Sequence, residues 1–212
     1  MTPALKEWAI AIDALTSGKM ILLLRKGGIR EVNGKFQVAH QRVWLYPTYE
    51  HQQPQWLKPP YNQQIQSVPS GWHPTPVRLT SWADITHIFA TTDPAAVPAL
   101  LPFHVWNESF VLEKLRWKPR QPLYLLLLRV HQLQTPYTVP YQADYGGCRS
   151  WIDLTPDRPT ALAFDQDPTY PVLTDGEYAD RVKAIATLTA SWESQAESSN
   201  QSPPPDSSAT PR

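Results

Sequence analysis

Apolar residues occur in short runs along this chain, and glycine, proline or polar residues bound each run. Met20 to Leu24 is an unbroken run, and Leu123 to Leu133 begins with six apolar residues in succession. Continuous apolar runs of this length are typical of strands covered on both faces, so we expect the second to be central in a sheet. Further strands are predicted at 43–46, 77–79, 85–89 and 150–154.

A different period marks the start of the chain. Apolar side chains recur at helical spacing between residues 5 and 15, Pro3 suits a first helical position, and Gly18 suits a helix end. We therefore predict a helix over 3–17 with Thr2 as its cap. Shorter helices are expected at 94–101 after Asp93 and at 108–115, and a last helix is expected after Thr174 or Asp175.

Asn33 and Gly34 form the clearest turn signal, because both residues tolerate the positive φ of a two-residue hairpin turn. This turn would pair Glu31 with Phe36, which places Glu31 on an apolar face. A carboxylate there needs a cation or a proton, and Arg129 at the end of the leucine-rich strand could supply the cation. The alternative is that Glu31 lies near the hairpin tip and reaches water.

These elements predict one α+β domain with a central antiparallel or mixed sheet, which could curl into a small barrel, and with flanking helices. Residues 53–76 hold six prolines among Gln, Asn and Ser and should form a long loop. We place the core domain at 1–155, an acidic extension with one helix at 156–194 and a disordered tail at 195–212.

The composition favours a cytoplasmic protein. Cys148 is the one cysteine among 212 residues, so no internal disulfide can form, and no apolar stretch is long enough to cross a membrane. The histidines are scattered without metal-ligand spacing, so we predict no metal site and no cofactor.

Charge is unevenly distributed although the net charge is zero. Residues 1–152 carry 15 Lys and Arg against 9 Asp and Glu, whereas residues 153–212 carry 4 against 10. A basic body with an acidic end suits an anionic ligand. The alternative is an ordinary solvated surface with accidental asymmetry.

Candidate site residues occur where strands end. Residues 46–52 crowd aromatic, carboxylate, imidazole and amide groups at the entry to the proline-rich loop, and Lys26 precedes two glycines whose amides could hold an anion. We predict a ligand-binding set of Arg25, Lys26, Glu50, His51, Gln52, Arg129 and Arg149. Candidates for acid–base chemistry are Glu31, Glu50 and His51. Three tryptophans, Trp106, Trp117 and Trp151, are expected in the core.

Four segments together resemble the 1802 family of domains of unknown function. They are Leu5 to Trp8, Leu24 to Ile29, Trp44 to Gln52 and Tyr145 to Trp151. The resemblance implies a bacterial, including cyanobacterial, protein and a link to DNA metabolism or restriction, but it implies no established activity.

Our leading interpretation is a binding module for an anionic ligand, with nucleic acid or a nucleotide as the first class of partner. The first alternative is a metal-assisted or acid–base hydrolase or nuclease that uses Glu31, Glu50 and His51. The second alternative is a scaffold protein that binds a protein partner through the proline-rich loop.

Overall fold

The computed structural model describes residues 2–27, 29–32, 35–147, 149–155, 164 and 168–200, without the side chains of 30–32, 35–37 and 191–200. Its strands are β1 (Thr2–Trp8), β2 (Leu22–Arg25), β3 (Ile29–Val32), β4 (Lys35–Val38), β5 (Arg42–Thr48), β6 (Val77–Thr91), β7 (Leu123–Val139), β8 (Trp151–Leu154) and β9 (Thr169–Pro171). Its α-helices are α1 (Ala9–Thr16), α2 (Val97–Leu100), α3 (Glu108–Arg116) and α4 (Asp175–Asn200). Short 3-10 helices are η1 (Pro54–Trp56), η2 (Tyr61–Gln63), η3 (Pro94–Ala96), η4 (Leu101–Phe103) and η5 (Ala143–Tyr145).

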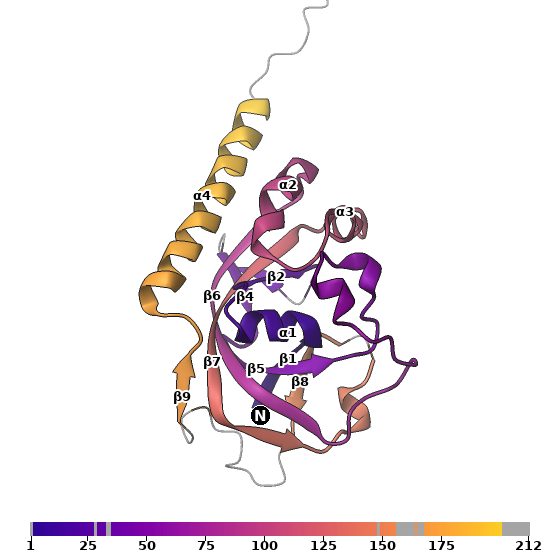
Figure 1. Cartoon of the computed structure of the whole chain (residues 1–212). Helices are drawn as coiled ribbons and strands as arrows, with labels where there is room; N and C mark the ends of the chain where they lie inside the picture. Colours follow the sequence, from indigo (N-terminus) through magenta and orange to yellow (C-terminus); the bar gives the residue numbers. More distant parts are fainter. Residues whose placement is uncertain are drawn as a thin grey trace, which may run out of the picture.

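One mixed sheet organises these elements (Figure 1). Its strand order is β2-β7-β6-β5-β1-β8, with β9 paired to β7, and the β3-β4 hairpin forms a separate sheet. Strands β1 and β5 are parallel, and the other pairs are antiparallel. The predicted α+β class with a mixed sheet is therefore confirmed, and the sheet is open rather than closed into a barrel.

The start of the chain is a strand followed by a helix, so the prediction of one helix over 3–17 is wrong for its first half. Local propensity favours a helix, because Ala4, Leu5, Lys6 and Glu7 are all good helix formers. In the structure β1 instead pairs with β5 on one side and β8 on the other, and Ala4 and Leu5 are both fully buried. Tertiary pairing on both sides thus overrides local propensity.

The leucine-rich strand is central, as predicted. Leu125, Leu126, Leu127 and Leu128 are all fully buried, so β7 is covered on both faces. The two segments expected at 77–79 and 85–89 form one long strand, β6, whose register against β7 shifts at two irregularities. Such irregularities bend a strand and increase its twist, which helps a long strand to follow a curved sheet.

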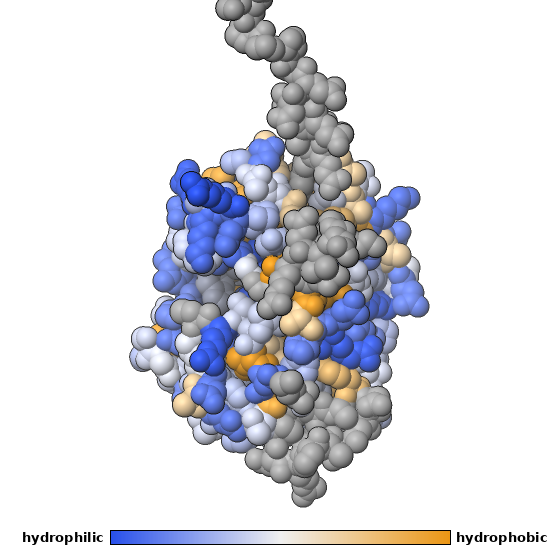
Figure 2. Space-filling model, turned by 180° about the vertical axis from the view of Figure 1, so that it is seen from behind, coloured by the Kyte–Doolittle hydropathy of each residue, from blue (hydrophilic) through white to orange (hydrophobic). Residues whose placement is uncertain are grey.

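Two apolar cores lie on opposite faces of the sheet. Along β5, Val43 and Leu45 belong to the larger core, which also holds residues of all four α-helices. Trp44 and Tyr46 belong to a smaller aromatic core on the other face. This alternation follows from the two-residue period of a strand. Figure 2 shows the side opposite to Figure 1, where hydrophilic residues surround small hydrophobic areas.

The hairpin register is the predicted one, with Glu31 opposite Phe36 and Val32 opposite Lys35. Asn33 and Gly34, which would form the turn, lie outside the described residues, as does the side chain of Glu31. The Arg129 guanidinium donates to the carboxylate of Asp175 at 2.7 Å. Its expected pairing with Glu31 falls on a side chain outside the described residues.

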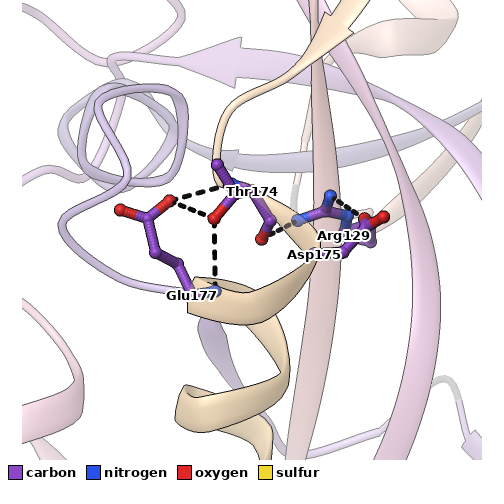
Figure 3. Close-up of polar contacts among 4 residues, drawn as sticks. All are labelled: Arg129, Thr174, Asp175 and Glu177. Atoms are coloured by element: carbon purple, nitrogen blue, oxygen red, sulfur yellow. Dashed lines mark hydrogen bonds and ion pairs between the residues drawn. The ribbon is translucent and has the colours of Figure 1, made fainter.

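Helix α4 starts with a reciprocal cap (Figure 3). The Thr174 amide and hydroxyl donate to the Glu177 carboxylate, and the Glu177 amide donates to the Thr174 hydroxyl. These hydrogen bonds lower the pKa of Glu177. Arg129 of β7 adds hydrogen bonds to the Thr174 carbonyl and to Asp175, so it fixes the helix start to the sheet.

The first half of α4 packs against the body, and its second half extends beyond it (Figure 1). Tyr178 and Ile185 belong to the larger core, and the Tyr178 hydroxyl lies 2.5 Å from that of Thr86 on β6. Helix α4 runs to Asn200, so residues 195–200 of the predicted tail belong to it, and residues 201–212 lie outside the described residues.

Because Ile185 is 0% exposed, we expect Ile185→Ala to lower the free energy of unfolding by about 2–5 kcal/mol. Urea unfolding followed by circular dichroism measures this change. The control Lys183→Ala alters an exposed residue of the same helix and should change stability by about 0.5 kcal/mol or less. Equal effects of the two variants would show that α4 contributes nothing to the core.

Candidate functional site

A cleft of about 620 Å³ opens where the parallel strands β1 and β5 end. Trp8 and Thr48, the last residues of these two strands, are register partners and both line it. The end of β2, helix α3 with the residues after it, and the segment before β8 form the other walls. Crevices at the carboxyl ends of parallel strands are common ligand sites, and this volume suits a small molecule.

Arg25 joins the two edges of the open sheet across this cleft. It ends β2, at one end of the strand order, and its guanidinium donates to the Lys6 carbonyl at 2.7 Å and to the Ser150 hydroxyl at 3.1 Å. It also pairs with the Glu7 carboxylate at 3.1 Å, and both side chains are nearly buried. These partners belong to β1 and to the residue before β8, which lie at the other end of the strand order.

Two lysines are anchored to backbone carbonyls beside Arg25. The Lys6 ammonium donates to the carbonyls of Tyr145 and Gly147, both at 2.7 Å. The Lys26 ammonium donates to the carbonyls of Leu115 and Gln121, which flank the end of α3. Burial lowers the pKa of Lys26. These bonds hold both ammonium groups in place.

Basic side chains outnumber acidic ones in the lining. The six cationic residues are Lys6, Arg25, Lys26, Lys114, Lys118 and Arg149. The two acidic residues are Glu7, which pairs with Arg25, and Glu50. Desolvation is the main cause that lowers the pKa of Lys114. The lining therefore favours a negatively charged occupant.

Glu50 and His51, which follow β5, line the same cleft. The Glu50 carboxylate accepts hydrogen bonds from the Gly71 amide at 2.7 Å and the Ser70 hydroxyl at 3.0 Å, and these bonds lower its pKa. His51 Nε2 lies 3.4 Å from the same carboxylate. Glu50 therefore orients the imidazole and ties residues 50–51 to the proline-rich loop.

Five of the seven predicted ligand-binding residues line this one cleft: Arg25, Lys26, Glu50, His51 and Arg149. Arg129 does not, because it serves the start of α4. Gln52 is buried, and its side-chain oxygen accepts from the Ile10 amide at 3.0 Å, so it satisfies a free N–H in the first turn of α1. Gln52 also lines a separate cavity of about 320 Å³ between α1 and the loop.

The sequence interpretation missed several lining residues: Lys6, Glu7, Lys114, Trp117 and Lys118. Lys6 and Glu7 were hidden in the expected helix, where neighbouring charges imply a solvated face. Trp117 is 53% exposed, so its prediction as a core residue is wrong, whereas Trp106 is 1% exposed and belongs to the larger core. The basic residues after Trp117 were the signal of a surface position.

Three buried nitrogen donors of lining residues have no hydrogen-bond partner among the described residues: Arg25 Nε, Trp106 Nε1 and Trp151 Nε1. Buried polar groups in folded proteins are normally paired.

No group of three or more His, Asp or Glu side chains in the described part of the chain could hold a metal ion. No helix of that part is long and apolar enough to cross a membrane.

The fold and cleft thus define an α+β protein with an open mixed sheet and a basic cleft at the carboxyl ends of its parallel strands. The chain belongs to the family described as Domain of unknown function (DUF1802), whose model matches residues 4–184. The resemblance inferred from the sequence is confirmed. Comparisons with curated proteins and with solved structures give no match.

His104 lies next to the cleft wall, with its ring centroid 5.8 Å from that of Trp106, and it should make stability depend on pH. Burial is the main cause that lowers the pKa of His104 to about 3, whereas an unfolded histidine titrates near 6.5. The unfolded chain therefore binds this proton first, and stability falls as pH drops below about 6.5, by up to about 1.4 kcal/mol per pH unit. Urea unfolding at pH 7, 6 and 5 measures the slope.

His104→Phe should reduce this slope, because it removes the His104 ring, whereas His131, whose pKa burial also lowers, still contributes to it. His87→Phe, which changes an exposed histidine of β6, is the control and should keep the wild-type slope. If His104→Phe also kept it, the loss of stability would have another source.

Proposed function

We propose that this protein is a binding module for an anionic ligand of the nucleotide or nucleic-acid class, and that the ligand occupies the basic cleft. The main support for this proposal is the composition of the lining, which has six Lys and Arg residues and two carboxylates. One of these carboxylates, Glu7, already pairs with Arg25. A 620 Å³ cleft has room for a ligand of nucleotide size.

The physical basis is that the positive charge here is preorganised. Arg25, Lys6 and Lys26 are held by hydrogen bonds to the protein, so little side-chain freedom is lost when an anion binds. Arg149 and Lys118 are exposed at the same cleft and are free to approach phosphates directly. The three cations held by hydrogen bonds favour an anion as the ligand. The two exposed cations add affinity that depends on the salt concentration.

Arg149→Ala should weaken binding of a single-stranded oligonucleotide and reduce its salt dependence. Loss of one phosphate contact reduces the slope of log K against log [salt] by about 0.7. Fluorescence anisotropy of a labelled oligonucleotide at 50–300 mM salt, roughly the range over which such contacts weaken, measures both quantities. Arg78→Ala, which removes an exposed arginine of β6 outside the cleft, should leave both unchanged. Absence of binding at low salt would refute the proposal.

A second candidate function, acid–base hydrolysis of a phosphodiester, is favoured by the 3.4 Å contact between His51 Nε2 and Glu50. A carboxylate that stays ionised can orient a histidine as a general base, and the lowered pKa of Glu50 meets this condition. Glu31, the third candidate for acid–base chemistry, has its side chain outside the described residues.

His51→Gln should lower the turnover of bis(p-nitrophenyl) phosphate by about 10²-fold or more, because general base catalysis contributes about that much. The control His87→Gln should retain turnover, since His87 is exposed on β6 away from the cleft. If the wild-type protein does not release nitrophenol, the hydrolase candidate is discarded and the binding module remains.

A further inference from the structure

The lining residues of the cleft differ in depth, and their chemistry changes with it. Trp106 at 1% exposure and Lys26 at 7% form the floor. Trp117 at 53% exposure and the exposed Lys118 and Arg149 form the rim. The floor and the rim therefore meet different parts of an occupant.

Three side chains of the lining carry hydrogen-bond donors that are unpaired. Arg25 Nε, Trp106 Nε1 and Trp151 Nε1 are buried and unpaired among the described residues. Guanidinium and indole nitrogens can donate but cannot accept. Together with the surrounding cations, they favour an occupant that only accepts. An oxyanion such as phosphate is such a group, whereas an ammonium group is not.

The rim offers a flat aromatic face. Trp117 is half-exposed, and the Lys118 ammonium lies 4.5 Å from its ring centroid. An exposed indole with a cation beside it is a stacking platform for a base whose phosphate is nearby.

Unusual backbone conformations also occur at this cleft. Within the described residues, two non-glycine residues have positive φ, His51 at 67° and Lys118 at 50°, and both line this cleft. Such strained residues cluster at functional sites. The left-handed residue Lys118 directly follows Trp117 at the rim of the cleft.

We infer that the cleft recognises an unpaired nucleoside phosphate unit, with its phosphate among the cations of the lining and its base stacked on Trp117. This inference rests on the proposed function and specifies its ligand. A base inside a duplex is stacked on both faces and has none free for Trp117, so a duplex is excluded. The unit can come from a free nucleotide or from a single strand, and the two sources share this chemistry.

The test compares four probes on wild type, Trp117→Ala and Trp72→Ala by isothermal titration calorimetry. The probes are inorganic pyrophosphate, adenosine monophosphate, a 5′-phosphorylated single-stranded oligonucleotide and the corresponding blunt duplex. Trp72 is the matched control, because it is 43% exposed and does not line this cleft. Thermal unfolding of each variant verifies that it is folded.

Trp117→Ala should weaken binding of adenosine monophosphate, of the oligonucleotide, or of both, by about 5- to 150-fold, the contribution of one stacked base. Pyrophosphate affinity should not change, because that probe has no ring, and Trp72→Ala should behave as wild type. The nucleotide probe that binds more tightly to wild type identifies the source of the unit.

Three results would overturn the inference. Equal affinity for the duplex and the single strand would contradict recognition of an unpaired base. An unchanged nucleotide affinity in Trp117→Ala, with pyrophosphate still bound, would refute base stacking but leave anion binding in place. Failure of all four probes to bind wild type would refute the proposed function together with the inference.

Discussion

The hydrogen bonds and ion pair of Arg25 are the interaction on which the site depends, because they join two edges that the sheet leaves apart. In the described part of the chain, the open sheet has β2 at one end and β8 at the other, and these two strands are not paired with each other. A single guanidinium spans the gap between them through Lys6, Glu7 and Ser150. A closed barrel would have filled this space with backbone and core side chains, whereas a side-chain bridge leaves room for a cleft.

Arg25 combines two roles that usually conflict. A nearly buried ion pair costs desolvation energy and is weak evidence for stability by itself. Here the same guanidinium keeps one nitrogen, Nε, buried and without a partner among the described residues. The arrangement is costly for folding alone, so its position beside the cleft indicates a constraint other than stability. The unpaired indole nitrogens of Trp106 and Trp151 repeat this pattern.

The sequence was most informative where one local signal decides the outcome. Asn33 and Gly34 predicted the β3-β4 register, and the apolar run of β7 predicted a strand buried on both faces. The first residues were mispredicted, because Ala4 to Glu7 favour a helix locally and strand pairing is a long-range property. The same misprediction concealed Lys6 and Glu7 as lining residues. Residues of the site come from five separate parts of the chain, and no sequence pattern shows that β2 and β1 face each other across a gap.

The hydrogen bonds of Lys26 bear on how the width of the cleft opening could vary. Its ammonium holds the carbonyls of Leu115 and Gln121, which bracket the end of α3 and Trp117. The spacing between the walls is thus set by the short segment between these two carbonyls. An insertion or deletion between residues 116 and 121 would therefore widen or narrow the opening while the sheet stayed intact.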